Sequence, residues 1–145
     1  MKWNKEAVQD LRDYESLEAF IKSYPEQMKA LEEDFCSLKA CVTDKIPVMG
    51  GVSRVDDNLI NNIAKRERLA MNYAAAQKRY NLIKEALDTL DERQRHILDC
   101  FFIHRQENHC ELLCEELHME KSHIYRLKDD ALYTFTIAMY GMTEY

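Results

Sequence analysis

The stretch of sequence that decides the fold is HCELLCEELHMEKSHIYRL, residues 109–127. Apolar side chains recur three and four positions apart on both sides of a polar break at His118-Met119-Glu120. That spacing predicts two short helices joined by a three-residue turn. Two such helices in this order form the outline of a helix-turn-helix.

Both predicted helices meet the stereochemical demands of this motif. The first needs apolar residues four positions apart with a small residue between them, and Leu113, Cys114 and Leu117 fit. The second needs two apolar residues three positions apart that face back, and Ile124 and Leu127 fit. The first residue of the turn often has a positive φ and is commonly glycine; histidine, which stands here, is among the side chains enriched in that conformation.

The other face of the second helix is then available to a nucleic acid. Its N-terminal half would enter the major groove of DNA, where basic, hydroxyl and imidazole groups donate to base edges or phosphates. The candidate DNA-binding residues are Lys121, Ser122, His123, Tyr125, Arg126 and Lys128. The alternative interpretation is the solvated face of an ordinary pair of helices.

The rest of the chain is also predicted to be helical. Only 3 glycines and 2 prolines occur among 145 residues, too few turn residues for a β-sandwich or barrel, so we expect an all-α fold. Three of these five residues lie in 43–56, which predicts a connector loop. Pro25 indicates the start of a second helix or a kink in the first.

Apolar residues three and four positions apart predict one long helix on each side of that loop. Before the loop the apolar positions with this spacing are Met28, Leu31, Phe35, Leu38 and Val42. After the loop, Leu59, Ile60 and Ile63 begin an apolar face, and the same spacing continues it through Tyr73, Ala76, Tyr80, Ile83, Leu87 and Leu90. We expect residues 1–90 to form an antiparallel, coiled-coil-like helical hairpin, and residues 91–145 to form the helix-turn-helix lobe. The same stripes could instead pair between two chains, as a homodimer.

Three helix starts have sequence signals. Asp91-Glu92-Arg93-Gln94 and Asn108-His109-Cys110-Glu111 have the form of a capping box, in which the first side chain caps the helix and the fourth reaches back. Asp56 or Asp57 is the expected cap of the helix that follows the loop.

The charge distribution bears on any interface with DNA. The net charge is −6, and residues 91–145 carry 6 basic and 11 acidic side chains, so the predicted DNA-binding lobe is the more acidic part. Because phosphate attracts Lys and Arg, we expect weak binding by a monomer and useful binding only by a dimer or a polymerase-bound complex.

Residues 87–135 resemble the region-4-like helix-turn-helix of sigma factors, and the order of parts resembles the ArpU/RinA-like phage transcriptional regulators. The resemblance rests mainly on LDTLDERQR (87–95) and EELHMEKSHIYRLKDDAL (115–132). It implies binding to promoter double-stranded DNA, control of late-gene transcription in a bacterial host, and contact with RNA polymerase. The sequence departs from the pattern at His118 and Asp129-Asp130, where glycine and basic residues are common.

Other chemistry has weaker signals. Cys110, Cys114 and His118 stand four positions apart, so a zinc site is conceivable, although small buried thiols are common. No phosphate loop, metalloprotease pattern or nucleophile elbow is present, and we expect neither an enzyme nor a cofactor. The basic run KRER at 65–68 could contact phosphate or form a solvated face.

The expected location is the cytoplasm, without membrane association. No apolar run approaches the roughly 18 residues that a bilayer requires, and the N-terminus lacks the apolar region of a secretory signal. The 5 cysteines, an odd number, are typical of reduced thiols. The rival hypothesis is a protein-interaction module of the same fold that has lost DNA binding and uses its acidic C-terminal lobe against a protein partner.

Overall fold

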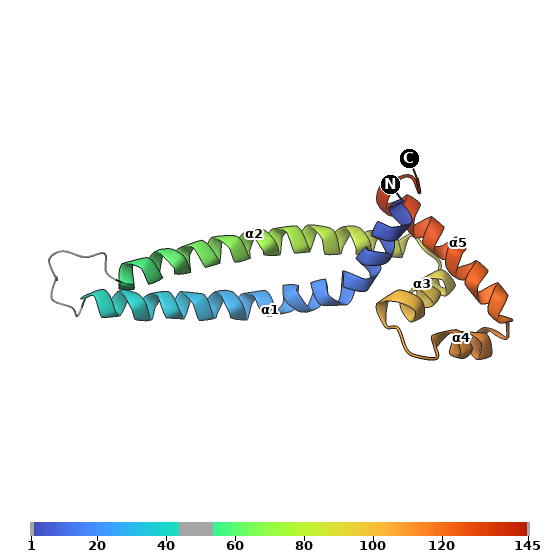
Figure 1. Cartoon of the computed structure of the whole chain (residues 1–145), viewed down its shortest axis with the longest axis horizontal. Helices are drawn as coiled ribbons and strands as arrows, with labels where there is room; N and C mark the ends of the chain where they lie inside the picture. The colour runs from blue at the N-terminus through green and yellow to red at the C-terminus, as the bar shows by residue number, and fades with distance from the viewer. Residues whose placement is uncertain (1, 44–53, 145) are drawn as a thin grey trace. The chain divides into compact units, whose positions relative to one another are not determined.

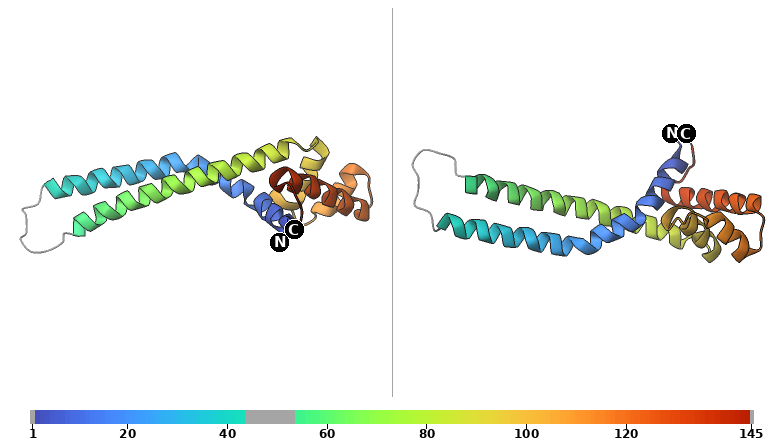
Figure 2. Two further views of the ribbon diagram at one scale, coloured as in Figure 1. Left: turned by 90° about the horizontal axis from the view of Figure 1, so that it is seen from above. Right: turned by 60° about the horizontal axis from the view of Figure 1, so that its bottom comes forward.

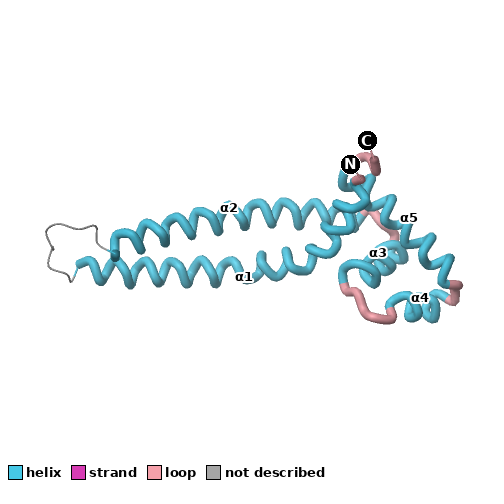
Figure 3. The backbone as a smooth tube through the Cα atoms, viewed as in Figure 1, coloured by secondary structure: helices cyan, strands magenta, loops and turns pink. Residues whose placement is uncertain are grey.

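The computed structural model describes residues 2–43 and 54–144, and most of these residues lie in helices (Figure 1, Figure 3), which confirms the predicted all-α fold. The elements are α1 (Trp3–Thr43), α2 (Arg54–Asp88), α3 (Glu92–Leu98), the π-helical turn η1 (Asp99–Ile103), α4 (His109–Leu117) and α5 (Lys121–Tyr140). Residues 44–53, most of the predicted connector loop, lie outside the described residues.

The chain divides into two compact units, and both long helices contribute to each. One unit comprises residues 1–18 and 78–145, and the other comprises residues 19–77. This division differs from the predicted one at residue 90, because Ala7 and Leu11 of α1 share a buried core with Phe135 of α5. The unit that contains the helix-turn-helix stretch therefore includes the start of the chain; it is called the C-terminal unit below.

The unit of residues 19–77 is a helical hairpin, as predicted. Its α1 and α2 segments run side by side in opposite directions (Figure 2). The rings of Tyr24 and Tyr73 stack with their centroids 4.0 Å apart, and the Arg66 guanidinium lies 4.7 Å from the centre of the Phe35 ring. Apolar and aromatic contacts between the two helices thus hold the hairpin together.

Three local predictions for the long helices need correction. Pro25 lies inside α1, so no second helix begins there, and of the two predicted alternatives only a kink in α1 remains. Helix α2 begins at Arg54, and Asp56 and Asp57 lie in its first turn rather than at its cap. Carboxylates in a first turn still favour the helix, because they face the positive end of its dipole.

The third correction concerns the apolar face of α2. The sequence pattern places Ile60 and Ile63 on that face, but they are 64% and 41% exposed. The nearby position that is buried is polar: Asn62 is 6% exposed.

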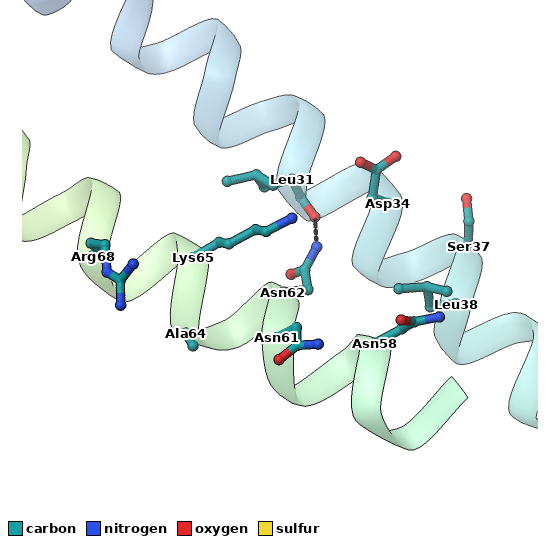
Figure 4. A pocket seen from close by; sticks show the side chains of 10 residues that line it. All are labelled: Leu31, Asp34, Ser37, Leu38, Asn58, Asn61, Asn62, Ala64, Lys65 and Arg68. Atoms are coloured by element: carbon teal, nitrogen blue, oxygen red, sulfur yellow. Dashed lines mark hydrogen bonds between the residues drawn. The ribbon is translucent and has the colours of Figure 1, made fainter. Parts of the chain in front are cut away.

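Asn62 connects the two helices of the hairpin. Its Nδ2 donates a hydrogen bond of 2.9 Å to the Leu31 carbonyl oxygen of α1 (Figure 4). Its Oδ1 is buried without a hydrogen-bond partner among the described residues, beside a groove of about 630 Å³ that Lys65 and Arg68 also line. A buried amide of this kind costs stability, but it fixes the register of the two helices.

A buried carboxylate joins three helices of the C-terminal unit. Asp10 of α1 is 5% exposed and accepts hydrogen bonds from Arg79 Nε at 3.0 Å and Arg79 Nη2 at 2.7 Å. The Tyr140 hydroxyl at the end of α5 donates to the same carboxylate. Burial and this hydrogen bond raise the pKa of Tyr140, so the phenol stays protonated and remains a donor.

The two ends of the described chain are held together beside this carboxylate. The Trp3 ring stacks on Tyr140 with centroids 4.8 Å apart, and the Trp3 backbone N–H donates to the Thr143 carbonyl oxygen at 2.9 Å. The last turn of α5 is therefore fixed against the first turn of α1.

Removing the Asp10 carboxylate should destabilise the C-terminal unit. The Asp10→Ala variant leaves Arg79 and Tyr140 without their buried acceptor, and we expect a loss of about 2–4 kcal/mol, since Arg79 itself is partly solvated. Urea unfolding followed by circular dichroism measures the loss. The control is Asp13→Ala, which removes a 3.1 Å ion pair to the same arginine from a side chain that is 35% exposed; its cost should stay below about 1 kcal/mol. Equal losses in the two variants would contradict this account of Asp10.

Candidate nucleic-acid interface

The segment before the helix-turn-helix begins with a capping box, as predicted. The Asp91 side chain accepts a 2.7 Å hydrogen bond from the Gln94 backbone N–H, and the Gln94 Oε1 accepts from the Asp91 N–H at 3.4 Å. Helix α3 passes directly into η1, whose wider turn ends where the His104 N–H donates to the Asp99 carbonyl oxygen. The start and the end of this segment are thus both set by local hydrogen bonds.

His104 is held between two carboxylates at the end of η1. Its Nδ1 lies 2.6 Å from Asp99 Oδ1, and its Nε2 lies 3.4 Å from Glu15 Oε1. These neighbours, the Asp99 hydrogen bond above all, raise the pKa of His104 above its ordinary value of 6.5. The raised pKa favours the protonated imidazole, which in that form pairs with both carboxylates and links η1 to α1.

Helices α4 and α5 pack through the apolar residues predicted from the sequence. Leu113 and Ile124 are fully buried, while Cys114, Leu117 and Leu127 are half-buried beside them. The cluster is completed by Ile97, Phe101 and Cys110. All five predicted packing positions thus face one small core, as a helix-turn-helix requires.

The turn between these helices has a left-handed backbone at its first residue, the conformation for which this motif commonly uses glycine. His118 has φ 52° and ψ 46°, and its N–H donates to the Cys114 carbonyl oxygen. The Met119 N–H donates to the same oxygen at 3.2 Å. Among the described non-glycine residues, His118 alone has a positive φ, so the sharp turn is obtained at a conformational cost.

The predicted capping box at Asn108 does not form. Asn108 has φ −107° and ψ 34°, and its side chain makes no capping hydrogen bond. A capping side chain needs an extended backbone to reach the first turn, and these angles are not extended. Instead, the Asn108 carbonyl oxygen accepts from the Leu112 N–H at 3.0 Å, and His109 Nδ1 lies 2.8 Å from the Gln106 carbonyl oxygen.

Five of the six candidate DNA-binding residues on α5 are exposed, and only Lys128 is half-buried. Lys121, Ser122, His123 and Arg126 all face solvent. Ser122, His123 and Arg126 also line a shallow hollow of about 310 Å³ next to the turn, together with His118, Met119 and Glu120. A hydroxyl, an imidazole and a guanidinium therefore converge on one concave surface.

The other two candidates, Tyr125 and Lys128, lie against the aromatic part of the core. Tyr125 is 40% exposed, and its ring packs edge-on to Phe101 at 5.7 Å. Lys128 Nζ lies 2.9 Å from Asp129 Oδ1 and 5.5 Å from the centre of the Tyr125 ring. The charge of Lys128 is thus partly compensated within the chain.

Arg93 is a cation near the turn that the sequence analysis missed. It lies in the first turn of α3, is exposed, and its Nη2 donates to Met119 Sδ at 3.0 Å. The two residues are 26 positions apart, and no motif links them, so only the folded structure reveals their contact.

Acidic side chains border the basic surface. On α5, Asp129 and Asp130 follow Arg126 and are exposed; on α4, Glu111, Glu115 and Glu116 are exposed. Glu116 Oε2 lies 2.7 Å from His96 Nε2. The positive side chains of this surface are therefore those in the first turns of α5 and Arg93.

The thiols and imidazoles of this unit include one close pair, His96 and Cys100. Among the described residues, no group of three or more His, Cys, Asp or Glu side chains is placed to hold a metal ion. His96 Nε2 faces both Glu116 Oε2 at 2.7 Å and Cys100 Sγ at 3.8 Å. Burial raises the pKa of the Cys100 thiol, which disfavours the nucleophilic thiolate.

Comparisons with known proteins add no assignment. No protein-family model matches the chain, and no curated protein or solved structure matches it significantly. Across residues 2–43 and 54–144, every helix is too short or too polar to span a bilayer.

Replacing His118 by glycine should stabilise the protein. Glycine adopts the left-handed conformation without a Cβ clash, so His118→Gly should raise the free energy of unfolding by about 1 kcal/mol. The matched control is His123→Gly, an exposed position inside α5, where glycine should lower stability by about 1 kcal/mol. Thermal unfolding at neutral pH compares the two variants, and a loss of stability in His118→Gly would show that the imidazole itself supports the turn.

The ion pairs of His104 should make stability depend on pH. Because the folded pKa is raised, the contribution is complete below the unfolded value of 6.5 and is lost as pH rises through the folded pKa. The stability difference between the natural chain and His104→Gln should therefore be largest in mild acid and shrink toward alkaline pH. Urea midpoints measured for both proteins between about pH 5.5 and 8.5 test this; a difference that stays constant over that range contradicts it.

Proposed function

We propose that this chain is a phage or prophage transcriptional regulator that binds promoter DNA through α4 and α5 and contacts RNA polymerase in the cytoplasm of a bacterial host. The observation that carries the proposal is the packing of α4 on α5 through buried Leu113 and Ile124 around the left-handed turn at His118. This arrangement leaves the first two turns of α5 free to enter a major groove.

Each exposed side chain at the start of α5 has a role in this proposal. Arg126 has the donor geometry to contact a guanine edge, and Ser122 and His123 lie one turn before it and can donate to bases or phosphates. Lys121 and Arg93 flank the turn and would meet the phosphate backbone.

The acidic border predicts how the complex behaves with salt. Asp129 and Asp130 must point away from the phosphates, so only a few cations per chain neutralise DNA. About three phosphate contacts are expected. A plot of the logarithm of the binding constant against the logarithm of the salt concentration should then have a slope of about −3. We therefore expect moderate, salt-sensitive affinity for non-specific duplexes.

The decisive variant is Lys121→Ala combined with Arg126→Ala. Binding of a fluorescently labelled duplex, followed by anisotropy over a salt series, should weaken by about tenfold or more, because each lost contact is worth about 1–3 kcal/mol or one released counterion. Thermal stability should not change, since both side chains are exposed.

The control removes two lysines from the hairpin instead. Lys29→Ala with Lys39→Ala makes the same change in net charge at exposed positions of α1, and it should leave DNA affinity nearly unchanged. Equal losses in both double variants would mean that only overall charge matters. Absence of salt-dependent DNA binding, with association to a protein partner retained, would favour the interaction module that uses the exposed carboxylates of the acidic lobe.

A further inference from the structure

The hairpin unit has an exposed apolar stripe on α2 that its own packing does not use. Ile60 is 64% exposed, Ile63 41% and Met71 73%. Exposed alanines at 64, 74 and 75 lie on the same side of the helix, since these positions follow one another at helical spacing. We call the residues Ile60, Ile63, Ala64, Glu67, Met71, Ala74 and Ala75 the outer stripe.

Most of the outer stripe lies away from α1, although Ala64, and Arg68 at the edge of the stripe, also line the groove between the two helices. The α2 residues that contact α1 are at other helical positions, such as Asn62, Arg66 and Tyr73. At about 1.5 Å per residue the outer stripe, from residue 60 to residue 75, is about 22 Å long. Single exposed apolar residues are normal on a protein surface, but several apolar residues in a row on one helix face are typical of an interface.

One charged residue interrupts the row. Glu67 lies at the middle of the outer stripe, and Arg68 stands beside it at the edge. Both are exposed, and within the part of the chain that the structure describes neither forms an ion pair. The centre of the stripe thus offers one negative and one positive charge side by side.

We propose that the outer stripe is a dimer interface, covered by the α2 helix of a second copy that runs in the opposite direction. A two-fold axis between residues 67 and 68 makes the surface complementary to itself. Glu67 of each copy then faces Arg68 of the other, and Met71 of each copy faces the small Ala64. At the ends of the stripe, Ile60 faces Ala75.

The alternative direction is disfavoured by the same residues. In a parallel pair of α2 helices, Glu67 meets Glu67, and Met71 meets Met71. Like charges directly opposite each other repel, and large side chains opposite large ones leave gaps at the alanines. Both charge and size therefore favour the antiparallel pair.

This inference is independent of DNA binding, because the stripe lies in residues 60–75 and the DNA-binding candidates lie in α5. A dimer would carry two copies of α5, which would raise affinity for paired half-sites if the proposed function holds.

Charge reversal on the full-length chain tests the interface. Light scattering after size exclusion, over a series of protein concentrations, should show the natural chain moving from monomer to dimer mass. Glu67→Arg should remain monomeric because the introduced guanidinium then meets Arg68 of the other copy, and Arg68→Glu should remain monomeric because two glutamates meet. An equimolar mixture of the two variants should recover the dimer mass, since every facing pair is again of opposite charge.

The controls are Glu33→Arg and Lys39→Glu, exposed charge reversals on α1, which should leave the dimer intact. Circular dichroism checks that each variant keeps its helices. Met71→Lys places a charge in the outer stripe and should also prevent the dimer. The proposal is overturned by a natural chain that stays monomeric at all concentrations, by dimers that persist in both charge variants, or by a mixture that does not dimerise. The Lys121→Ala, Arg126→Ala chain should still dimerise, so a failure of DNA binding and a failure of this interface are distinguishable.

Discussion

The buried carboxylate of Asp10 is the constraint on which the C-terminal unit depends. A charge inside a protein needs hydrogen-bond donors, and Asp10 receives them from Arg79 and Tyr140. These donors belong to α2 and α5, so satisfying one carboxylate fixes three helices at one point. The far end of α5 is thereby anchored, while its first turns, which carry the DNA-binding candidates, stay exposed.

The turn before α5 imposes the second constraint. His118 accepts a left-handed backbone so that α4 can stop and α5 can leave at the angle that buries Leu113 and Ile124. A histidine in this conformation is strained compared with glycine. The strained residue also lines the hollow beside Arg126, so the same position shapes the turn and the candidate interface.

Local signals in the sequence were sufficient for much of the architecture. The hairpin and the Asp91 capping box follow from helical spacing and short-range side-chain chemistry, which act over a few residues. The positive φ of His118, in contrast, occurs at a position where the motif commonly has glycine. The Asn108 capping box failed because its motif specifies residue types and not the backbone angles. Residues 1–18 could not be assigned to the C-terminal unit from pattern alone, since their partners lie more than 60 positions away.

The features of the candidate interface also fall into two groups: those that local spacing predicts and those that depend on tertiary packing. The exposure of Ser122 and Arg126 follows from their spacing relative to Ile124. The packing of Tyr125 and Lys128 near Phe101 does not, because Phe101 lies in η1, and a π-helical turn shifts the register that a regular helix would have. The sequence pattern could not indicate that Arg93 lies near the turn, because only tertiary packing brings it to Met119.

The most direct test of the central claim is an NMR titration of the ¹⁵N-labelled chain with a short DNA duplex. Amide shifts should change over residues 118–126 and at Arg93, while residues 19–41 of the hairpin should remain unchanged. Shift changes that avoid the start of α5, or no change at low salt, would contradict the account of α5 as a DNA-reading helix.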